Sequence, residues 1–462
     1  MLFNSTVFLF VFLPVTYLVF WRLQSRNARY IWLAATGYVF YGYWNPAFCL
    51  LMAFSTLVSF SAGLGFLRWP EDPRMRKLFL AVPITVDLLL LGFFKYTNFL
   101  LGTLNDVLLW NNRPAIPLMD IVLPVGISFY TFHTITYIVD CYRGHIEPTR
   151  NPVEFACYVS LFSQLVAGPI VRFSELQADL EGIDRADRRA GLDSGWSFFA
   201  IGLAQKIIIA DTIAAVIDPA LKNAASLSSP GAWLCMLGYS YQLYFDFAGY
   251  SNMAVGLGRL FGMSIPQNFD APYAAMNPSD FWRRWHISLS RCLRDYLYVP
   301  LGGSRGGERR TCRNLMITML LGGLWHGAQW TFVVWGGYHG LLLILYRRYQ
   351  RFWDRAPVWA QRTAMFLLAV FGWTIFRAQN WAQAGVILNR MLIPHDGVLP
   401  IASATLALAI VVAASFAHFG PNTFQLTHRW RPATAAGLTT LFAICLVRIY
   451  GSENSPFLYF HF

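Results

Sequence analysis

The stretch Gly322-Gly323-Leu324-Trp325-His326-Gly327-Ala328-Gln329-Trp330 lies within an uncharged segment that is bounded by Arg313 and Arg347. The 33 residues between these arginines would span about 50 Å as one straight helix, whereas the hydrocarbon core of a bilayer is about 30 Å thick. Both ends are rich in arginine, which favours the cytoplasmic side of a membrane. We therefore predict a hairpin or broken helix that enters and leaves from the cytoplasm, with its bend at the glycines.

His326 is predicted to lie about 18 Å from the cytoplasmic entry of this hairpin, deep in the membrane. An ionisable side chain is costly at that depth, so a functional role is the default hypothesis. A buried imidazole stays neutral and can accept a proton from an alcohol, which makes His326 a candidate general base. The alternative is a structural histidine that hydrogen-bonds a neighbouring helix.

The composition indicates a polytopic α-helical membrane protein. Hydrophobic residues make up 56% of the chain and charged residues only 13%, and apolar runs near 20 residues long recur. The net charge of +12 lies mostly in short loops, where it sets topology, so nucleic-acid binding is not predicted. The seven cysteines are scattered, so neither a disulfide framework nor a metal site is predicted.

Basic loops alternate with the apolar runs and give a consistent orientation. Arg22, Arg26 and Arg29 follow the first run, which we expect to be a span and not a signal peptide, and place the N-terminus outside the cytoplasm. Residues 152–171 contain Gly168-Pro169 between arginine-rich flanks and predict a re-entrant hairpin. Spans are predicted at about 7–20, 29–43, 46–69, 78–94, 119–139, 193–217, 231–262, 358–376, 400–418 and 433–449, with an outer segment after Lys95.

Residues 279–313 are the most basic part of the chain and alternate with aromatic residues, which is typical of a helix at the cytoplasmic interface. The arginines either only set topology or also form a docking surface for an anionic cosubstrate, such as the phosphates of coenzyme A or an acidic carrier protein. The candidate donor-binding residues are Arg283, Arg284, Arg291 and Arg305.

Other polar residues in apolar or interfacial segments have two interpretations each. His286, beside two arginines and two tryptophans, is either functional or a headgroup or packing contact. Asp246 either orients a histidine or pairs with Lys206. His339 and His133 are interpreted as structural.

Six motifs resemble the membrane-bound O-acyltransferases, in the bacterial branch that contains the alginate O-acetylation and teichoic-acid D-alanylation membrane proteins. The matching motifs are residues 166–170 (VAGPI), 245–251 (FDFAGYS), 268–273 (NFDAPY), 281–286 (FWRRWH), 298–305 (YVPLGGSR) and 323–330 (GLWHGAQW). The resemblance covers most of the chain up to about residue 350, whereas the spans at about 358–449 match only in hydropathy.

The resemblance implies a single integral-membrane domain over residues 1–462, with its core motifs at about 120–350. It implies a ring of about 11 tilted transmembrane helices, with re-entrant and interfacial helices, around a central tunnel. His326 would be the catalytic histidine at the narrow middle of the tunnel, and His286 a second recurrent histidine near its cytoplasmic mouth. The candidates for lining the tunnel are Trp325, Trp330, Asp246 and Asn268.

We therefore predict an O-acyltransferase of the bacterial inner membrane, with no bound cofactor, that O-acetylates an exported polysaccharide such as alginate. The donor would be acetyl-CoA or a carrier-bound thioester, and a periplasmic acetyl-acceptor or transferase partner is expected beside the membrane lipids. One alternative is D-alanyl or other acyl transfer to a cell-wall polymer. Another is a transporter lined by His326, Lys206 and Asp246, which predicts inverted repeats that the sequence lacks.

Overall fold

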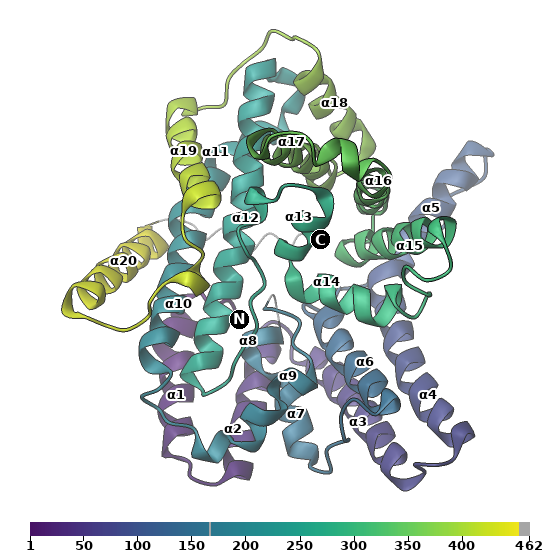
Figure 1. Cartoon of the computed structure of the whole chain (residues 1–462), viewed down its shortest axis with the longest axis vertical. Helices are drawn as coiled ribbons and strands as arrows, with labels where there is room; N and C mark the ends of the chain where they lie inside the picture. The colour runs from purple at the N-terminus through teal and green to yellow at the C-terminus, as the bar shows by residue number, and fades with distance from the viewer. Residues whose placement is uncertain (166–167, 452–462) are drawn as a thin grey trace. The chain divides into compact units, whose positions relative to one another are not determined.

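The computed structural model describes residues 1–165 and 168–451, and its regular elements in these ranges are helices (Figure 1). The isolated bridge in the described part of the chain joins Leu227 to Val398. The chain divides into two compact units, Met1–Trp196 with Ala254–Pro266, and Ser197–Met253 with Gln267–Phe462. The prediction of an all-α fold is confirmed, whereas the tunnel and the single domain stay predictions.

The first unit begins with a π-helical turn at Phe8–Phe12 and contains a second one at Gly92–Tyr96. Its α-helices are α1 (Leu13–Arg22), α2 (Arg26–Gly42), α3 (Ala47–Arg68), α4 (Pro73–Leu91), α5 (Thr97–Trp110), α6 (Ile127–Arg143), α7 (Pro152–Ser160), α8 (Phe162–Leu165) and α9 (Phe173–Glu181). The segment after Lys95, expected to leave the membrane, is instead helical, because α4, the second π-turn and α5 form one helix of 38 residues. Lys95 lies inside this helix, and its ammonium donates to the Ser128 hydroxyl at 3.3 Å.

The predicted re-entrant segment at residues 152–171 contains two short helices. Helix α7 has 9 residues and α8 has 4, and the chain turns at Leu161 between them. Neither helix approaches the roughly 20 residues that a transmembrane helix needs. Val166 and Ala167 of the predicted motif lie outside the described residues.

The remaining helices are α10 (Leu192–Ala204), α11 (Asp211–Lys222), α12 (Ser229–Leu260), α13 (Pro278–Arg284), α14 (Ile287–Leu293), α15 (Glu308–His326), α16 (Trp330–Trp353), α17 (Val358–Arg377), α18 (Trp381–Leu392), α19 (Ser403–Phe419) and α20 (Pro432–Gly451). A π-helical turn at Gln205–Ala210 joins α10 to α11. The basic interfacial stretch is not one helix but α13, α14 and a further π-turn at Arg294–Tyr298, followed by the start of α15. Sequence reasoning missed α9 and α18.

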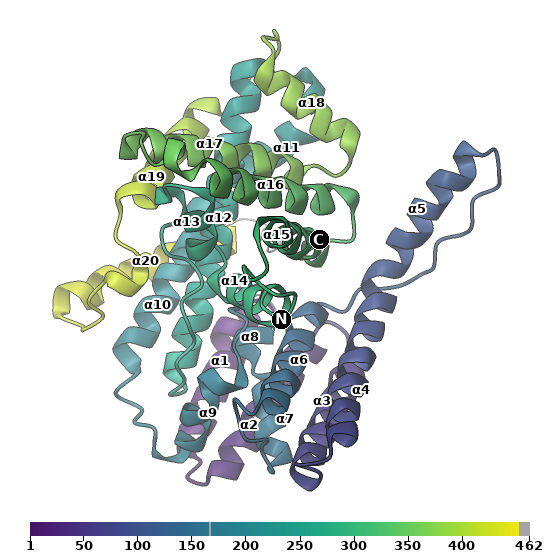
Figure 2. The ribbon, with the colours of Figure 1, turned by 45° about the vertical axis from the view of Figure 1, so that its right-hand side comes forward.

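Helices α15 and α16 form the predicted hairpin and lie side by side (Figure 2). The expected bend at the glycines is found at Gly327 but not at Gly322 or Gly323, because α15 continues through these two to His326 and the turn follows at residues 327–329. Gly323 permits close packing instead. A Cβ on Gly323 would collide with the Phe332 carbonyl oxygen, and one on Gly336 with the Met319 carbonyl oxygen.

Several helices can cross a membrane. Within the described residues, 5 helices are long and apolar enough: Ala47–Arg68, Pro73–Trp110, Leu192–Lys222, Val358–Arg377 and Pro432–Gly451. Two shorter apolar helices, Phe8–Arg22 and Ser403–Phe419, accompany them. The protein is therefore a multi-pass membrane protein, and the expected number of about 11 spans stays a prediction.

Candidate active site

Asn268 connects the segment before α13 to the start of α14. Its Oδ1 accepts hydrogen bonds from Nδ1 of His286 at 3.1 Å and from the backbone N–H and hydroxyl of Ser288 at 3.2 and 2.9 Å. Its Nδ2 donates to the Ser251 hydroxyl at 3.2 Å. The main chain follows the same pairing, since the N–H of Ile287 donates to the Asn268 carbonyl at 2.9 Å. One buried amide therefore fixes the His286 loop.

These contacts determine the tautomer of His286. Because the backbone N–H of Ser288 donates to the same Asn268 atom, that atom is the oxygen, and Nδ1 of His286 carries the proton. His286 is fully buried and lies outside the membrane-spanning helices, and burial lowers its pKa to about 3. Its Nε2 is buried and bonded to no residue of the described chain. The ring is neutral, with an unused acceptor atom.

His326 is the last residue of α15 and is only 4% exposed. The centroid of its ring lies 6.3 Å from the ring of His286. The resemblance implied separate places for these histidines, in the middle of a tunnel and near its mouth. The structure brings their two rings into one cluster, and their places along a tunnel stay predictions.

Aromatic side chains surround the two imidazoles. The centroid of the His326 ring lies 5.0 Å from the Trp325 ring, 5.1 Å from the Trp335 ring and 5.6 Å from the Phe376 ring. Sequence reasoning anticipated Trp325 but missed Trp335 and Phe376. The available signal for Trp335 was its position four residues before His339 on one face of α16, whereas Phe376 comes from the separate helix α17.

Asp246 pairs with Lys206, which settles an open alternative. Lys206 Nζ lies 2.6 Å from Asp246 Oδ1 and 2.7 Å from Asp211 Oδ1. Lys206 and Asp246 are both buried, and Asp211 begins α11 directly after the π-helical turn that holds Lys206. One lysine thus holds two carboxylates from two helices, as intramembrane charges usually do.

Some of the candidate arginines line a cavity of about 480 Å³ beside α13, α14 and α15. Arg283, Arg291 and Arg294 contribute to its wall, together with the apolar side chains of Trp282 and Met319. The ring of Trp282 lies 5.8 Å from that of Trp335, which in turn contacts His326. The lining thus combines three guanidinium groups with apolar side chains, and Trp335 connects one of these, Trp282, to His326. Arg294 was noted as part of the basic stretch but not selected as a donor-binding residue.

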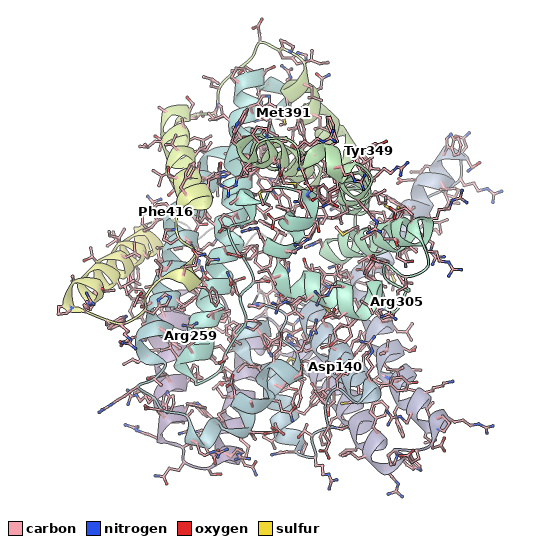
Figure 3. All side chains as sticks on the ribbon, in the orientation of Figure 1. Asp140, Arg259, Arg305, Tyr349, Met391 and Phe416 are labelled. Carbon is pink, nitrogen blue, oxygen red and sulfur yellow. The ribbon has the colours of Figure 1, made fainter. Side chains whose placement is uncertain are left out.

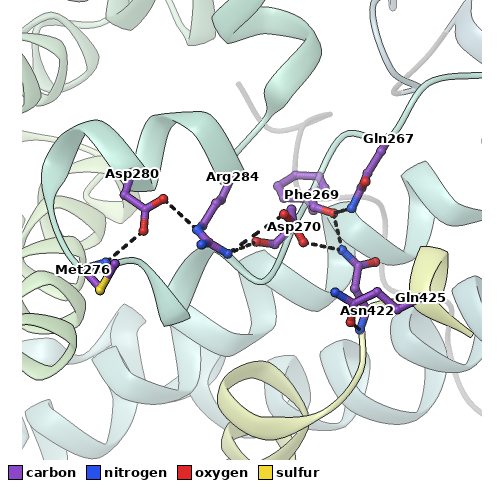
Figure 4. Close-up of polar contacts among 8 residues, drawn as sticks. All are labelled: Gln267, Phe269, Asp270, Met276, Asp280, Arg284, Asn422 and Gln425. Atoms are coloured by element: carbon purple, nitrogen blue, oxygen red, sulfur yellow. Dashed lines mark hydrogen bonds and ion pairs between the residues drawn. The ribbon is translucent and has the colours of Figure 1, made fainter. Parts of the chain in front are cut away.

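Other candidates lie elsewhere. Arg284 turns to Asp280 and Asp270, with its Nε 2.9 Å from Asp280 Oδ1 (Figure 4). Arg305 is exposed in the turn between α14 and α15 (Figure 3) and does not line this cavity. Trp330 is 46% exposed at the start of α16, in contrast to the buried Trp325. Arg284 and Arg305 thus lie outside the basic cavity, and Trp330 does not join the aromatic side chains around the two histidines.

Similarity to known proteins identifies the family of this chain. Residues 118–382 match the model of the membrane-bound O-acyltransferase family. The chain is 39% identical to a probable alginate O-acetylase of Pseudomonas putida over 100% of both chains. It is 33% identical to a peptidoglycan O-acetyltransferase of Helicobacter pylori over 100% of this chain and 98% of the relative. A teichoic acid D-alanyltransferase of Streptococcus thermophilus is 31% identical, over 48% of this chain and 56% of the relative. The protein is therefore a multi-pass O-acyltransferase that belongs to the membrane-bound O-acyltransferase family.

Proposed function

We propose that this O-acyltransferase moves an acetyl group from a cytoplasmic thioester to a hydroxyl group of an exported polysaccharide such as alginate. The observation that carries the proposal is the buried pair of His286 and His326, whose ring centroids lie 6.3 Å apart. The acetyl group is favoured over D-alanine because the relatives similar over the full chain are named as O-acetylases or O-acetyltransferases, whereas the D-alanyltransferase matches about half of it.

In the proposed reaction, the acceptor oxygen attacks the carbonyl carbon of the thioester. As the C–O bond forms, the proton of the hydroxyl passes to the neutral imidazole of His326. The C–S bond then breaks, and the leaving thiolate takes that proton from the imidazolium, so the products are an acetyl ester and a free thiol. Nε2 of His286 accepts a hydrogen bond from a second hydroxyl group of the acceptor and orients it, because the reacting hydroxyl gives its only proton to His326. Direct attack requires no covalent acyl-enzyme.

The donor is held in the cavity lined by Arg283, Arg291 and Arg294. Guanidinium groups bind phosphate oxygens through charge-assisted hydrogen bonds, which suits the phosphates of coenzyme A or of a carrier-bound phosphopantetheine. The apolar side chains of Trp282 and Met319 in the same lining suit the uncharged arm that carries the thioester. A lining with both kinds of side chain supports a long donor with one anionic end.

The proposed setting is the bacterial inner membrane, with the N-terminus in the periplasm and the donor in the cytoplasm. Arg22 and Arg26, which follow the first apolar helix, support this orientation by the positive-inside rule. A periplasmic partner that receives the acetyl group or presents the polymer completes the proposal. Membrane lipids surround the spans.

Replacing His326 with alanine tests the proposal in cells. Polymer acetylation and the amount of protein in the membrane are measured together. We expect acetylation to be lost while the protein level is maintained. Retained acetylation would show that His326 takes no part in the chemistry. D-alanyl esters on the polymer of the wild type would show that the transferred group is D-alanine and not acetyl. With purified protein, thiol release from acetyl-CoA supports the free donor, and its absence points to a carrier-bound thioester.

A further inference from the structure

A second cavity in the same unit has a different chemistry. Its volume is about 440 Å³, and its walls come from α10, the π-turn at Gln205–Ala210, α12, α19, the loop before Thr423 and α20. Its lining contains no Asp, Glu, Lys, Arg or His side chain, and it shares no residue with the lining of the basic cavity. It therefore offers nothing to neutralise the phosphates of a donor thioester.

Polar groups at one side of this cavity have hydrogen-bonding capacity to spare. Asn252 donates through Nδ2 to Gln205 Oε1 at 2.8 Å and to Thr423 Oγ1 at 3.1 Å. Within the described part of the chain, no residue accepts from Gln205 Nε2 and none donates to Asn252 Oδ1. A ligand in the cavity can thus meet an amide donor and an amide acceptor beside an apolar wall.

We infer that this cavity binds one acyl chain of a membrane lipid, with the ester carbonyl of that lipid accepting a hydrogen bond from Gln205 Nε2. The helical segments Leu192–Lys222 and Pro432–Gly451, which provide two of its walls, are membrane spans by length and hydropathy, so lipid chains are the abundant apolar molecules around them. The uncharged lining excludes an anionic group inside the cavity but suits an ester attached to a hydrocarbon chain.

The cavity adjoins the histidine cluster through Phe269. This residue lines the cavity, and its ring is stacked against that of His286 with centroids 6.4 Å apart. Asn422, which also lines the cavity, donates through Nδ2 to the Phe269 carbonyl and to Asp270 Oδ1, at 3.0 Å each (Figure 4). A bound chain would therefore contact the segment that carries Asn268. An effect of this contact on acetyl transfer rests on the proposed function, whereas lipid binding itself does not.

Photo-crosslinking tests the binding site without measuring acetyl transfer. The full chain is reconstituted in detergent-free phosphatidylcholine vesicles that contain a phosphatidylcholine with a diazirine on one acyl chain, and labelled peptides are mapped by mass spectrometry. We expect label near residues 204–209 and 416–426. Ala204→Phe, which places a ring in the cavity, should abolish that label. Ala220→Phe, at the wall of a separate cavity of about 420 Å³, should preserve it.

Gln205→Leu replaces the amide with an apolar side chain of similar size and so removes the donor. We expect the wild type to be labelled more by an ester-linked than by an ether-linked probe, and the variant to lose this preference. Label that persists in a monodisperse Ala204→Phe protein would overturn the inference. Wild-type label confined to other lipid-facing helices would do the same, and it would leave the proposed acetyl transfer unaffected.

Discussion

Nδ1 of His286 donates a hydrogen bond to Oδ1 of Asn268 across 3.1 Å, inside a site where both side chains are buried. This contact holds the imidazole as the Nδ1–H tautomer and leaves Nε2 as an acceptor. Asn268→Ala removes it, and we expect kcat to fall by about 10- to 100-fold, as for other residues that orient a functional histidine. The KM for the donor should change little, because Asn268 does not line the basic cavity.

The control for this substitution is Ser251→Ala, which removes a partner of Asn268 but leaves its bond to His286. Its kcat should stay within a few-fold of the wild type. Equal rates for Asn268→Ala and the wild type, measured as thiol release by purified protein, would show that the orientation of His286 is irrelevant to the reaction.

The pH dependence of the rate gives a second prediction. Burial lowers the pKa of His286 to about 3, so the ring stays neutral and titration of His286 should not affect kcat between about pH 5 and 8. Asn268→Asp places a carboxylate at Nδ1, which favours the imidazolium and raises the pKa. Since the neutral ring is the active form, kcat of the variant should fall as the pH decreases through this higher pKa. Parallel pH profiles for the variant and the wild type would contradict this role.

The basic cavity predicts which arginines bind the donor. Arg291→Gln removes a cation from its wall, and we expect the KM for the thioester to rise by about 10-fold, as expected for loss of a charge-assisted contact of about 1.5 kcal/mol. Arg305→Gln is the matched control, since Arg305 lies outside the cavity, and its KM should be unchanged. A larger rise in KM for Arg305→Gln than for Arg291→Gln would show that the donor binds at the turn between α14 and α15 instead.

Close packing of the hairpin predicts a difference between two glycines. Gly323→Ala places a Cβ against the Phe332 carbonyl oxygen, so we expect a loss of about 1–3 kcal/mol and a lower melting temperature in detergent. Gly337→Ala meets only the end of the flexible Leu320 side chain, with 3.3 Å to Cδ2, and should be tolerated. Similar melting temperatures for both variants would show that α15 and α16 separate easily.

The buried ion cluster predicts a compensated substitution. Lys206→Met leaves the carboxylates of Asp211 and Asp246 without the lysine that binds both, and we expect it to cost about 3–5 kcal/mol. Adding Asp211→Asn and Asp246→Asn removes the repulsion and should recover much of the melting temperature. A melting temperature for Lys206→Met equal to that of the wild type would mean that the cluster does not stabilise the fold.

The sequence was sufficient to predict the helical class, the hairpin and the buried position of His326, because hydropathy and an isolated ionisable residue are local signals. It did not tell which glycine makes the bend, because glycine both permits turns and allows helices to approach, and only the partner helix distinguishes these uses. The contact of His286 with Asn268 joins residues 18 positions apart through an irregular loop, with His286 at φ +43°. No periodicity encodes such a contact.

The most direct test of the central claim is single-turnover transfer by purified protein in lipid vesicles, with the polymer or a hydroxyl-bearing fragment of it as acceptor. Ester formation and thiol release are followed from a radiolabelled acetyl thioester. The account predicts that His326→Ala binds the donor as the wild type does but transfers acetyl at least about 100-fold more slowly. Transfer at the wild-type rate by a folded His326→Ala protein would contradict it.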